Sequence, residues 1–142
     1  MKNSYTYYFF IILVVLIAVL FTTINGSSES VYRSKSSSID NISTRELKEI
    51  IGAKREDIVL LDVRNTCEYD LGSIEGATLV PLQSIENGEA IDFIREIVIG
   101  HKLYIYCKGG SRSLQALRTL KRHNISGINV TGGIDSWASE TM

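Results

Sequence analysis

The chain lacks the features of several large protein classes. Its 142 residues contain two cysteines and two histidines, and no CxxC pair, which excludes a scaffold of several disulfides and leaves no zinc-finger spacing. Fifteen basic and sixteen acidic residues leave a net charge of −1, so no general attraction to nucleic acid is expected. The length and the 44% hydrophobic composition predict one globular domain, with no nucleic-acid partner.

The N-terminus carries a long apolar segment. Residues 5–24 contain no charged side chain, and residues 8–21 are apolar without interruption. A helix of about 20 residues spans a hydrocarbon core of about 30 Å, so we interpret residues 1–26 as a single-pass transmembrane anchor that binds the membrane through residues 5–24. The alternative is a cleaved signal peptide, because Gly26-Ser27-Ser28 is small enough for cleavage. The domain would then be secreted or periplasmic.

A serine-rich linker follows at residues 27–39, where seven of thirteen residues are serine and no apolar periodicity is present. Lys2 and the amino terminus favour an inside position for the N-terminus. We therefore expect the remaining part, residues 40–142, to form a domain outside the cytoplasm.

Within residues 40–142, short apolar runs alternate with helical patterns. Ser43 to Glu46 has the form of a capping box, and apolar residues follow at helical spacing up to Gly52. Apolar runs typical of strands lie at residues 58–61, 77–80, 103–106 and 128–130, and helices are expected at residues 91–98, 111–123 and 134–138. This alternation predicts an α/β fold, a parallel sheet flanked by helices and preceded by one transmembrane helix.

The most informative segment is Cys107-Lys108-Gly109-Gly110-Ser111-Arg112-Ser113, directly after the strand at residues 103–106. The carboxyl ends of parallel strands form the ligand-binding edge of a sheet, so we expect Cys107 there. The adjacent glycines allow successive backbone N–H groups to face one concavity, and the following helix adds the positive end of its dipole. Both favour thiolate over thiol. The segment predicts a nucleophilic Cys107 and an anionic substrate; the alternative is a buried, inert cysteine.

Residues 40–139 resemble the rhodanese-like sulfurtransferases in the order and spacing of three motifs. The motifs are Asp62-Val63-Arg64 with Glu68-Tyr69, Gly72 to Ala77 and Pro81; the loop Cys107 to Ser113; and Gly132-Gly133 with Trp137. The resemblance implies a rhodanese-like fold and a thiosulfate sulfurtransferase activity. A sulfane sulfur would pass from a donor such as thiosulfate to cyanide or a thiol through a persulfide on Cys107. No cofactor and no metal are implied.

Each residue of the loop then has a candidate role. Backbone N–H groups of Lys108, Gly109, Gly110, Ser111, Arg112 and Ser113 would bind the donor and stabilise the persulfide. The Lys108 ammonium would attract the anionic donor, and the Ser113 hydroxyl would either bond the cysteine sulfur or cap the helix. Arg112 would contact the donor, or it would pair with Asp62 or Glu68 to brace the loop.

The supporting residues are Asp62, Arg64 and Glu68. Arg64 would belong to the pocket wall or pair with Glu68, and Trp137 would be a core aromatic. Ser73 stands where the family commonly has histidine, a change we expect to be structural. Cys67 would be either a resolving thiol that attacks the persulfide or an incidental cysteine.

Two other functions compete with the sulfurtransferase. Related folds hydrolyse phosphate esters, but their loop has five residues between the cysteine and the arginine, whereas this loop has four. A membrane-tethered binding module without catalysis is the other alternative, and the presence of Cys107 argues against it.

Overall fold

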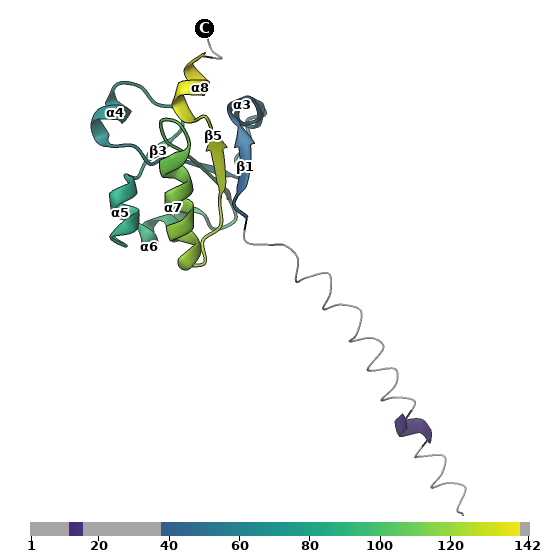
Figure 1. Ribbon diagram of the computed structural model, residues 1–142. Coiled ribbons are helices and arrows are strands. Elements are labelled where there is room, and N and C mark those ends of the chain that lie inside the picture. The colour runs from purple at the N-terminus through teal and green to yellow at the C-terminus, as the bar shows by residue number, and fades with distance from the viewer. Residues whose placement is uncertain (1–11, 16–37, 140–142) are drawn as a thin grey trace, which may run out of the picture. The chain divides into compact units, whose positions relative to one another are not determined.

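The computed structural model of the protein describes residues 12–15 and 38–139 (Figure 1). From Ile39 onward the chain forms one compact unit. Its elements follow in the order β1 (Asp40–Ser43), α3 (Thr44–Gly52), β2 (Ile58–Asp62), α4 (Thr66–Asp70), β3 (Thr78–Leu79), α5 (Leu82–Glu86), α6 (Ile91–Ile97), β4 (Lys102–Tyr106), α7 (Ser111–Arg122), β5 (Ile128–Thr131) and α8 (Gly133–Ser139).

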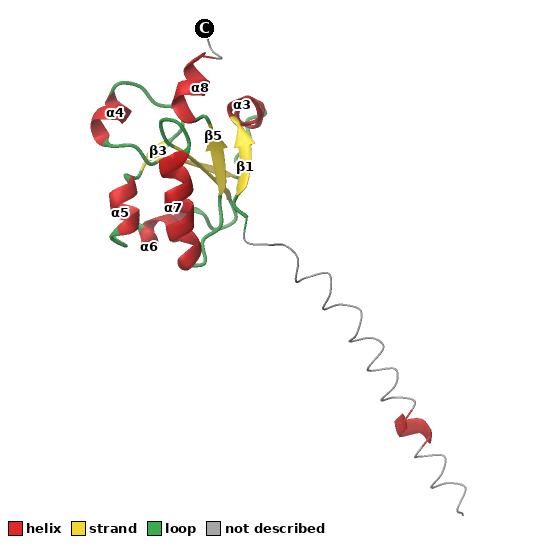
Figure 2. Ribbon diagram, viewed as in Figure 1, coloured by secondary structure: helices red, strands yellow, loops and turns green. Residues whose placement is uncertain are grey.

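The strands form a five-stranded sheet in the order β1-β5-β4-β2-β3, and every neighbouring pair is parallel (Figure 2). The predicted parallel α/β fold is therefore confirmed. Asp62 at the end of β2 is in register with Tyr106 at the end of β4. The residues that follow these two central strands consequently leave the sheet side by side at the same edge.

Two apolar layers enclose the sheet, as the alternation along β4 shows. Leu103 and Ile105 belong to a cluster with buried residues of α5, α6 and α7. Tyr104 and Tyr106 belong to a second cluster, which includes Leu47 of α3 and against which residues of α8 pack. Successive side chains of a strand point to opposite faces, so the sheet is covered on both sides, as a parallel sheet requires.

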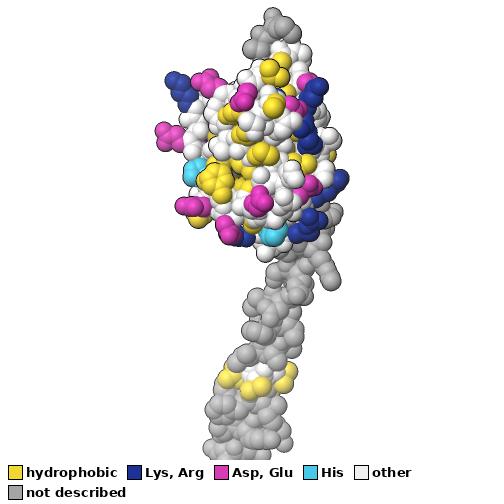
Figure 3. Space-filling model, turned by 90° about the vertical axis from the view of Figure 1, so that its left-hand side faces the viewer, with side chains coloured by type: hydrophobic (Ala, Val, Ile, Leu, Met, Phe, Trp, Pro, Cys, Tyr) yellow, Lys and Arg dark blue, Asp and Glu magenta, His cyan; other side chains and the backbone are white. Residues whose placement is uncertain are grey.

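The expected helices and strands are present, and three further short elements were not expected. The predicted capping box begins α3, because the Ser43 side chain accepts from the Glu46 N–H and the Glu46 carboxylate accepts from the Ser43 N–H. The strand β1 and the five-residue helices α4 and α5 lie where no regular element was expected. On the face shown in Figure 3, apolar side chains lie near the middle with acidic side chains around them, and most Lys and Arg side chains lie along the right-hand side.

The proposed membrane anchor finds no support in the described residues. Residues 12–15 are helical, but no helix of the described part is both long and apolar enough to cross a bilayer. The rest of the expected anchor at residues 5–24, and nearly all of the linker at residues 27–39, lie outside the described residues.

Candidate active site

The loop after β4 curves around the sulfur of Cys107. The Gly110 N–H donates to Cys107 Sγ at 3.1 Å, and the Ser113 hydroxyl lies 3.6 Å from the same sulfur. Gly110, which precedes α7, has a φ of +106°, a left-handed conformation that glycine adopts without a Cβ penalty. Cys107 is buried, so its sulfur is enclosed by donors rather than by water.

These donors lower the pKa of the thiol. Burial of Cys107 raises its pKa, but this effect is outweighed by hydrogen bonds from the Ser113 N–H and hydroxyl and from the N–H groups of Gly110 and Arg112. The net result is a pKa below the ordinary value of a thiol. Donors to the sulfur favour the charged form, so the loop favours the nucleophilic thiolate.

The glycine pair Gly132-Gly133, at the start of α8, holds the loop by close contact. The Ile134 N–H donates to the Cys107 carbonyl at 2.9 Å, and the Asp135 N–H donates to the Lys108 carbonyl at 3.2 Å. Gly133 has a φ of +56°, and a Cβ there would overlap both carbonyl oxygens. The Gly132-Gly133 motif therefore positions the backbone of the Cys107 to Ser113 loop.

Arg112 points to Glu68 of α4. Its Nη1 and Nη2 donate to the two carboxylate oxygens of Glu68, each at 2.7 Å. The bonds from Arg112 lower the pKa of Glu68 to about 2, although burial opposes them. Of the two roles considered for Arg112, the structure shows the bracing contact, and its partner is Glu68 rather than Asp62.

Arg64 pairs with Asp62 at the end of β2, not with Glu68 as one of the two expectations had it. The Asp62 carboxylate accepts from Arg64 Nη2 at 2.6 Å and from the Arg64 N–H at 2.9 Å. Arg64 Nη2 also donates to the Gly72 carbonyl at 2.7 Å. Both members of the pair are buried, so loss of either charge would leave the other poorly compensated.

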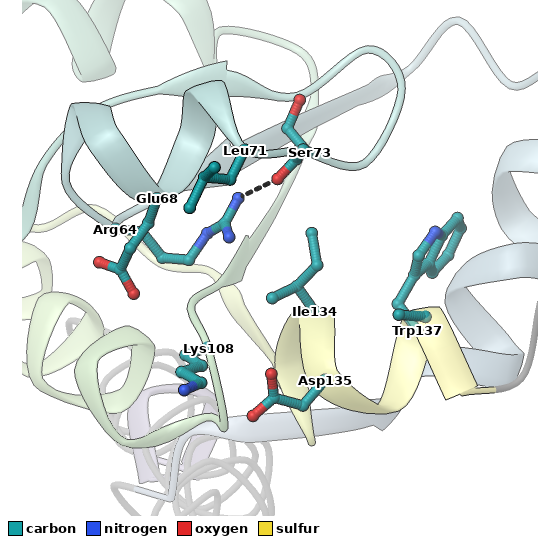
Figure 4. A pocket seen from close by; sticks show the side chains of 10 residues that line it. Arg64, Glu68, Leu71, Ser73, Lys108, Ile134, Asp135 and Trp137 are labelled. Carbon is teal, nitrogen blue, oxygen red and sulfur yellow. Dashed lines mark hydrogen bonds between the residues drawn. The ribbon is translucent and has the colours of Figure 1, made fainter.

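A cavity of about 540 Å³ lies beside the loop (Figure 4). Its wall contains the cations of Arg64 and Lys108 and the carboxylates of Glu68 and Asp135. The apolar part is formed by Leu71, Ile134, Trp137 and Ala138, and the remaining wall by Gly72 and Ser73. Arg64 thus belongs to the pocket wall as well as to an ion pair, and Ser73 also lines the cavity.

Trp137 is half-buried and packs against the second apolar cluster, while the Lys48 ammonium lies 5.0 Å from the centre of its ring. Cys67 is exposed on α4. Within residues 12–15 and 38–139, no group of three or more His, Cys, Asp or Glu side chains is placed to hold a metal ion.

Sequence reasoning missed Asn129, which lies in β5 and is buried. Asn129 Oδ1 accepts from the Ser113 hydroxyl at 2.6 Å. A polar residue between Ile128 and Val130 in an apolar strand is the signal that was available, since Asn129 points to the opposite face from its neighbours. Its hydrogen-bond partner Ser113 could not be predicted, because only the packing of α7 on β5 brings the two side chains together.

The fold and the loop define a class of protein: a parallel α/β domain with a buried cysteine in a donor-lined loop at the end of a central strand. The model of the rhodanese-like domain family matches residues 43–140. The chain belongs to this family.

Several curated proteins are similar to the chain. It is 43% identical over 72 residues to an uncharacterized 16.5 kDa protein in the psaL 5′ region of Synechococcus elongatus, covering 51% of the chain and 48% of that protein. It is 34% identical over 100 residues to the probable adenylyltransferase/sulfurtransferase MoeZ of Mycobacterium tuberculosis, covering 70% and 24%. It is 30% identical over 112 residues to the thiosulfate:glutathione sulfurtransferase of Saccharomyces cerevisiae, covering 72% and 81%. The match thus spans less than half the length of the first two relatives.

Solved structures agree on the fold. A rhodanese-like domain protein from Staphylococcus aureus is 30% identical with a TM-score of 0.60, covering 70% of this chain and 91% of that one. A protein of unknown function from Rhodopseudomonas palustris, described as a possible tyrosine phosphatase, is 25% identical with a TM-score of 0.67, covering 74% and 83%. Sulfurtransferase-named relatives at modest identity support a rhodanese-like transferase.

Proposed function

We propose that the protein is a sulfurtransferase that carries a sulfane sulfur as a persulfide on Cys107. The observation that carries the proposal is the set of donors around Cys107 Sγ, with the Gly110 N–H at 3.1 Å and further bonds from Arg112 and Ser113. Such donors stabilise a negative charge on sulfur, and both the attacking thiolate and the terminal sulfur of a persulfide carry that charge.

The reaction proceeds in two displacements. The Cys107 thiolate attacks the outer sulfur of thiosulfate, and sulfite leaves with the electron pair of the broken S–S bond. Cyanide or a thiolate then attacks the outer sulfur of the persulfide and releases the Cys107 thiolate. Lys108, whose side chain is exposed beside the cavity, attracts the anionic donor. Arg112, held by both oxygens of Glu68, keeps the loop in place.

The test is the intact mass of the purified protein before and after incubation with thiosulfate. We expect the mass to increase by one sulfur atom, and the increase to disappear on addition of cyanide with formation of thiocyanate. The Cys67→Ser variant, which removes the exposed cysteine, should gain the sulfur, whereas Cys107→Ser should not. No gain in a folded, reduced sample with thiosulfate or with other sulfane donors would contradict the proposal.

A phosphatase is the competing function. It would release phosphate from an aryl phosphate, which can be measured on the same purified protein. The description of the Rhodopseudomonas palustris protein as a possible tyrosine phosphatase makes this comparison worthwhile. Two features argue against it: the loop has four residues between Cys107 and Arg112, and the Arg112 guanidinium is engaged by Glu68. Neither activity in a folded protein would indicate a binding module.

We also propose that residues 5–24 anchor the protein in a membrane, with the domain outside the cytoplasm. The support is the uncharged apolar run of the sequence, whose length matches a bilayer. Membrane fractionation would test the anchor, and protease treatment of intact cells would test the orientation. Protease added to intact cells digests the domain only if it lies outside the cytoplasm. A soluble product whose first residue lies near Ser27 would instead show signal cleavage.

A further inference from the structure

A chain of side-chain hydrogen bonds connects the edge strand β1 to the site. Asn41 Nδ2 donates to the Ile39 carbonyl at 2.9 Å, and Asn129 Nδ2 donates to Asn41 Oδ1 at 2.8 Å. Asn129 Oδ1 accepts from the Ser113 hydroxyl at 2.6 Å. The Ser113 oxygen lies 3.6 Å from Cys107 Sγ, so the chain ends at the nucleophile.

The donor and acceptor directions in this series of hydrogen bonds are set at the Ile39 carbonyl, where the series begins. A backbone carbonyl only accepts hydrogen bonds, so Asn41 presents its Nδ2 to Ile39 and its Oδ1 to Asn129. Asn129 in turn presents its Oδ1, a pure acceptor, to Ser113. Asn129 is 2% exposed and Ser113 is 0% exposed. Because water does not reach either group, each must find its partner within the protein.

The Ser113 hydroxyl has one proton and three acceptors within reach. These are Asn129 Oδ1 at 2.6 Å, the Gly110 carbonyl at 2.9 Å and Cys107 Sγ at 3.6 Å. If the hydroxyl turned to the sulfur, the Gly110 carbonyl would keep the bond it accepts from the Leu114 N–H. Asn129 Oδ1 would lose its donor while buried, which is unfavourable. Asn129 is therefore the effective competitor of the sulfur.

We propose that Asn129 is a positioning residue that competes with the Cys107 sulfur for the Ser113 hydroxyl proton and thereby limits the thiolate fraction of the resting protein. The functional meaning of this restraint rests on the proposed function, since it concerns the nucleophile of that reaction. Hydrogen bonds that hold a residue beside the nucleophile in one orientation act on its chemistry without touching the substrate.

Charged groups around Cys107 come from several elements and do not depend on Asn129. They are Lys108 in the loop, Arg112 of α7 with its partner Glu68 of α4, Asp62 at the end of β2 with its partner Arg64, and Asp135 of α8. A substitution of Asn129 leaves all of them in place. A change in the titration of Cys107 can then be assigned to the Ser113 hydroxyl.

The experiment is a titration of Cys107 by the ultraviolet absorbance of its thiolate, in full-length protein carrying Cys67→Ser so that one thiol remains. Asn129→Leu should raise the ratio of thiolate to thiol at a given pH about tenfold, because the hydroxyl is released to the sulfur. Ser113→Ala should lower the ratio. In the Ser113→Ala background, Asn129→Leu should have no further effect.

A second variant protects the test against misfolding of Asn129→Leu. Asn41 is exposed, and Asn41→Ala removes the acceptor that orients Asn129, so we expect a smaller rise of the ratio in the same direction. The proposal is overturned if neither variant raises the ratio in folded protein, or if the rise persists without the Ser113 hydroxyl. The titration needs no sulfur donor, so its result is independent of whether Cys107 accepts sulfur.

Discussion

The ion pair between Glu68 and Arg112 should stabilise the folded protein by an amount that depends on pH. In the folded state the pKa of Glu68 falls from 4.5 to about 2, chiefly because of the bonds from Arg112. A shift of this size corresponds to about 3 kcal/mol. The two side chains are 25% and 33% exposed, and solvent screening reduces the contribution to about 1–2 kcal/mol.

The substitution that tests this value is Glu68→Gln. A glutamine still accepts from the Asn65 N–H, as the glutamate does at 3.2 Å, so the variant removes mainly the charge. A group whose folded pKa is depressed stabilises the protein above its unfolded pKa and ceases to do so as the pH falls through the folded pKa. The difference between parent and variant should therefore be complete at about pH 7 and fall to less than half at about pH 3.

Urea unfolding at both pH values measures this difference, with Glu75→Gln as the matched control. Glu75 is exposed, so its substitution should change the free energy of unfolding by less than about 0.5 kcal/mol. The reasoning is refuted if Glu68→Gln costs nothing at neutral pH, or if its cost is the same at about pH 3.

Three further predictions concern the loop and its surroundings. Gly133→Ala should displace the loop, abolish sulfur transfer and destabilise the protein by about 1–3 kcal/mol, because its Cβ would overlap two carbonyl oxygens of the loop. Gly109→Ala, which has open space around its Cβ, should keep both sulfur transfer and stability. Asp62→Asn should lower the free energy of unfolding in urea by about 3–5 kcal/mol, since it leaves the buried arginine of the pair without a counter-charge. Lys108→Ala should raise the KM for thiosulfate severalfold at low salt and less at high salt, while Lys121→Ala, on the last turn of α7, should leave the KM unchanged.

The parts of the fold that could be predicted are those with an uninterrupted run of apolar residues in the sequence. The run at Ile58–Leu61 and the run at Leu103–Tyr106 are central strands covered on both faces, and no polar residue interrupts them. In β1, by contrast, only Ile42 is apolar, because an edge strand needs fewer buried side chains. The helix α4 has five residues, too few for a helical period, and the structure shows a capping box from Asn65 to Glu68 from which no helix was predicted.

The site was predictable as far as the order of residues along the Cys107 to Ser113 segment determines it. The strand, the two glycines and the helix place the N–H groups around Cys107, and all three are consecutive in the sequence. The choice of partner for each arginine depends on the tertiary structure. Arg64 lies two residues from Asp62 and closes a local ring with it, whereas Glu68 and Arg112 are 44 residues apart. Spacing along the chain therefore could not decide between Asp62 and Glu68 as the partner of Arg112, and the local pair of Arg64 with Asp62 was not predicted.

The buried position of Cys107 follows from the same contacts that activate it. The N–H groups of the loop can converge on the sulfur only if the backbone surrounds it, and the bonds from Ile134 and Asp135 hold that backbone in place from α8. Enclosure alone would favour the neutral thiol, because burial raises the pKa of Cys107. The donors of the loop reverse this effect, and one of them, the Ser113 hydroxyl, also lies within hydrogen-bond distance of Asn129 Oδ1. The pKa of Cys107 is therefore a balance between burial, which raises it, and the donors of the loop, which lower it.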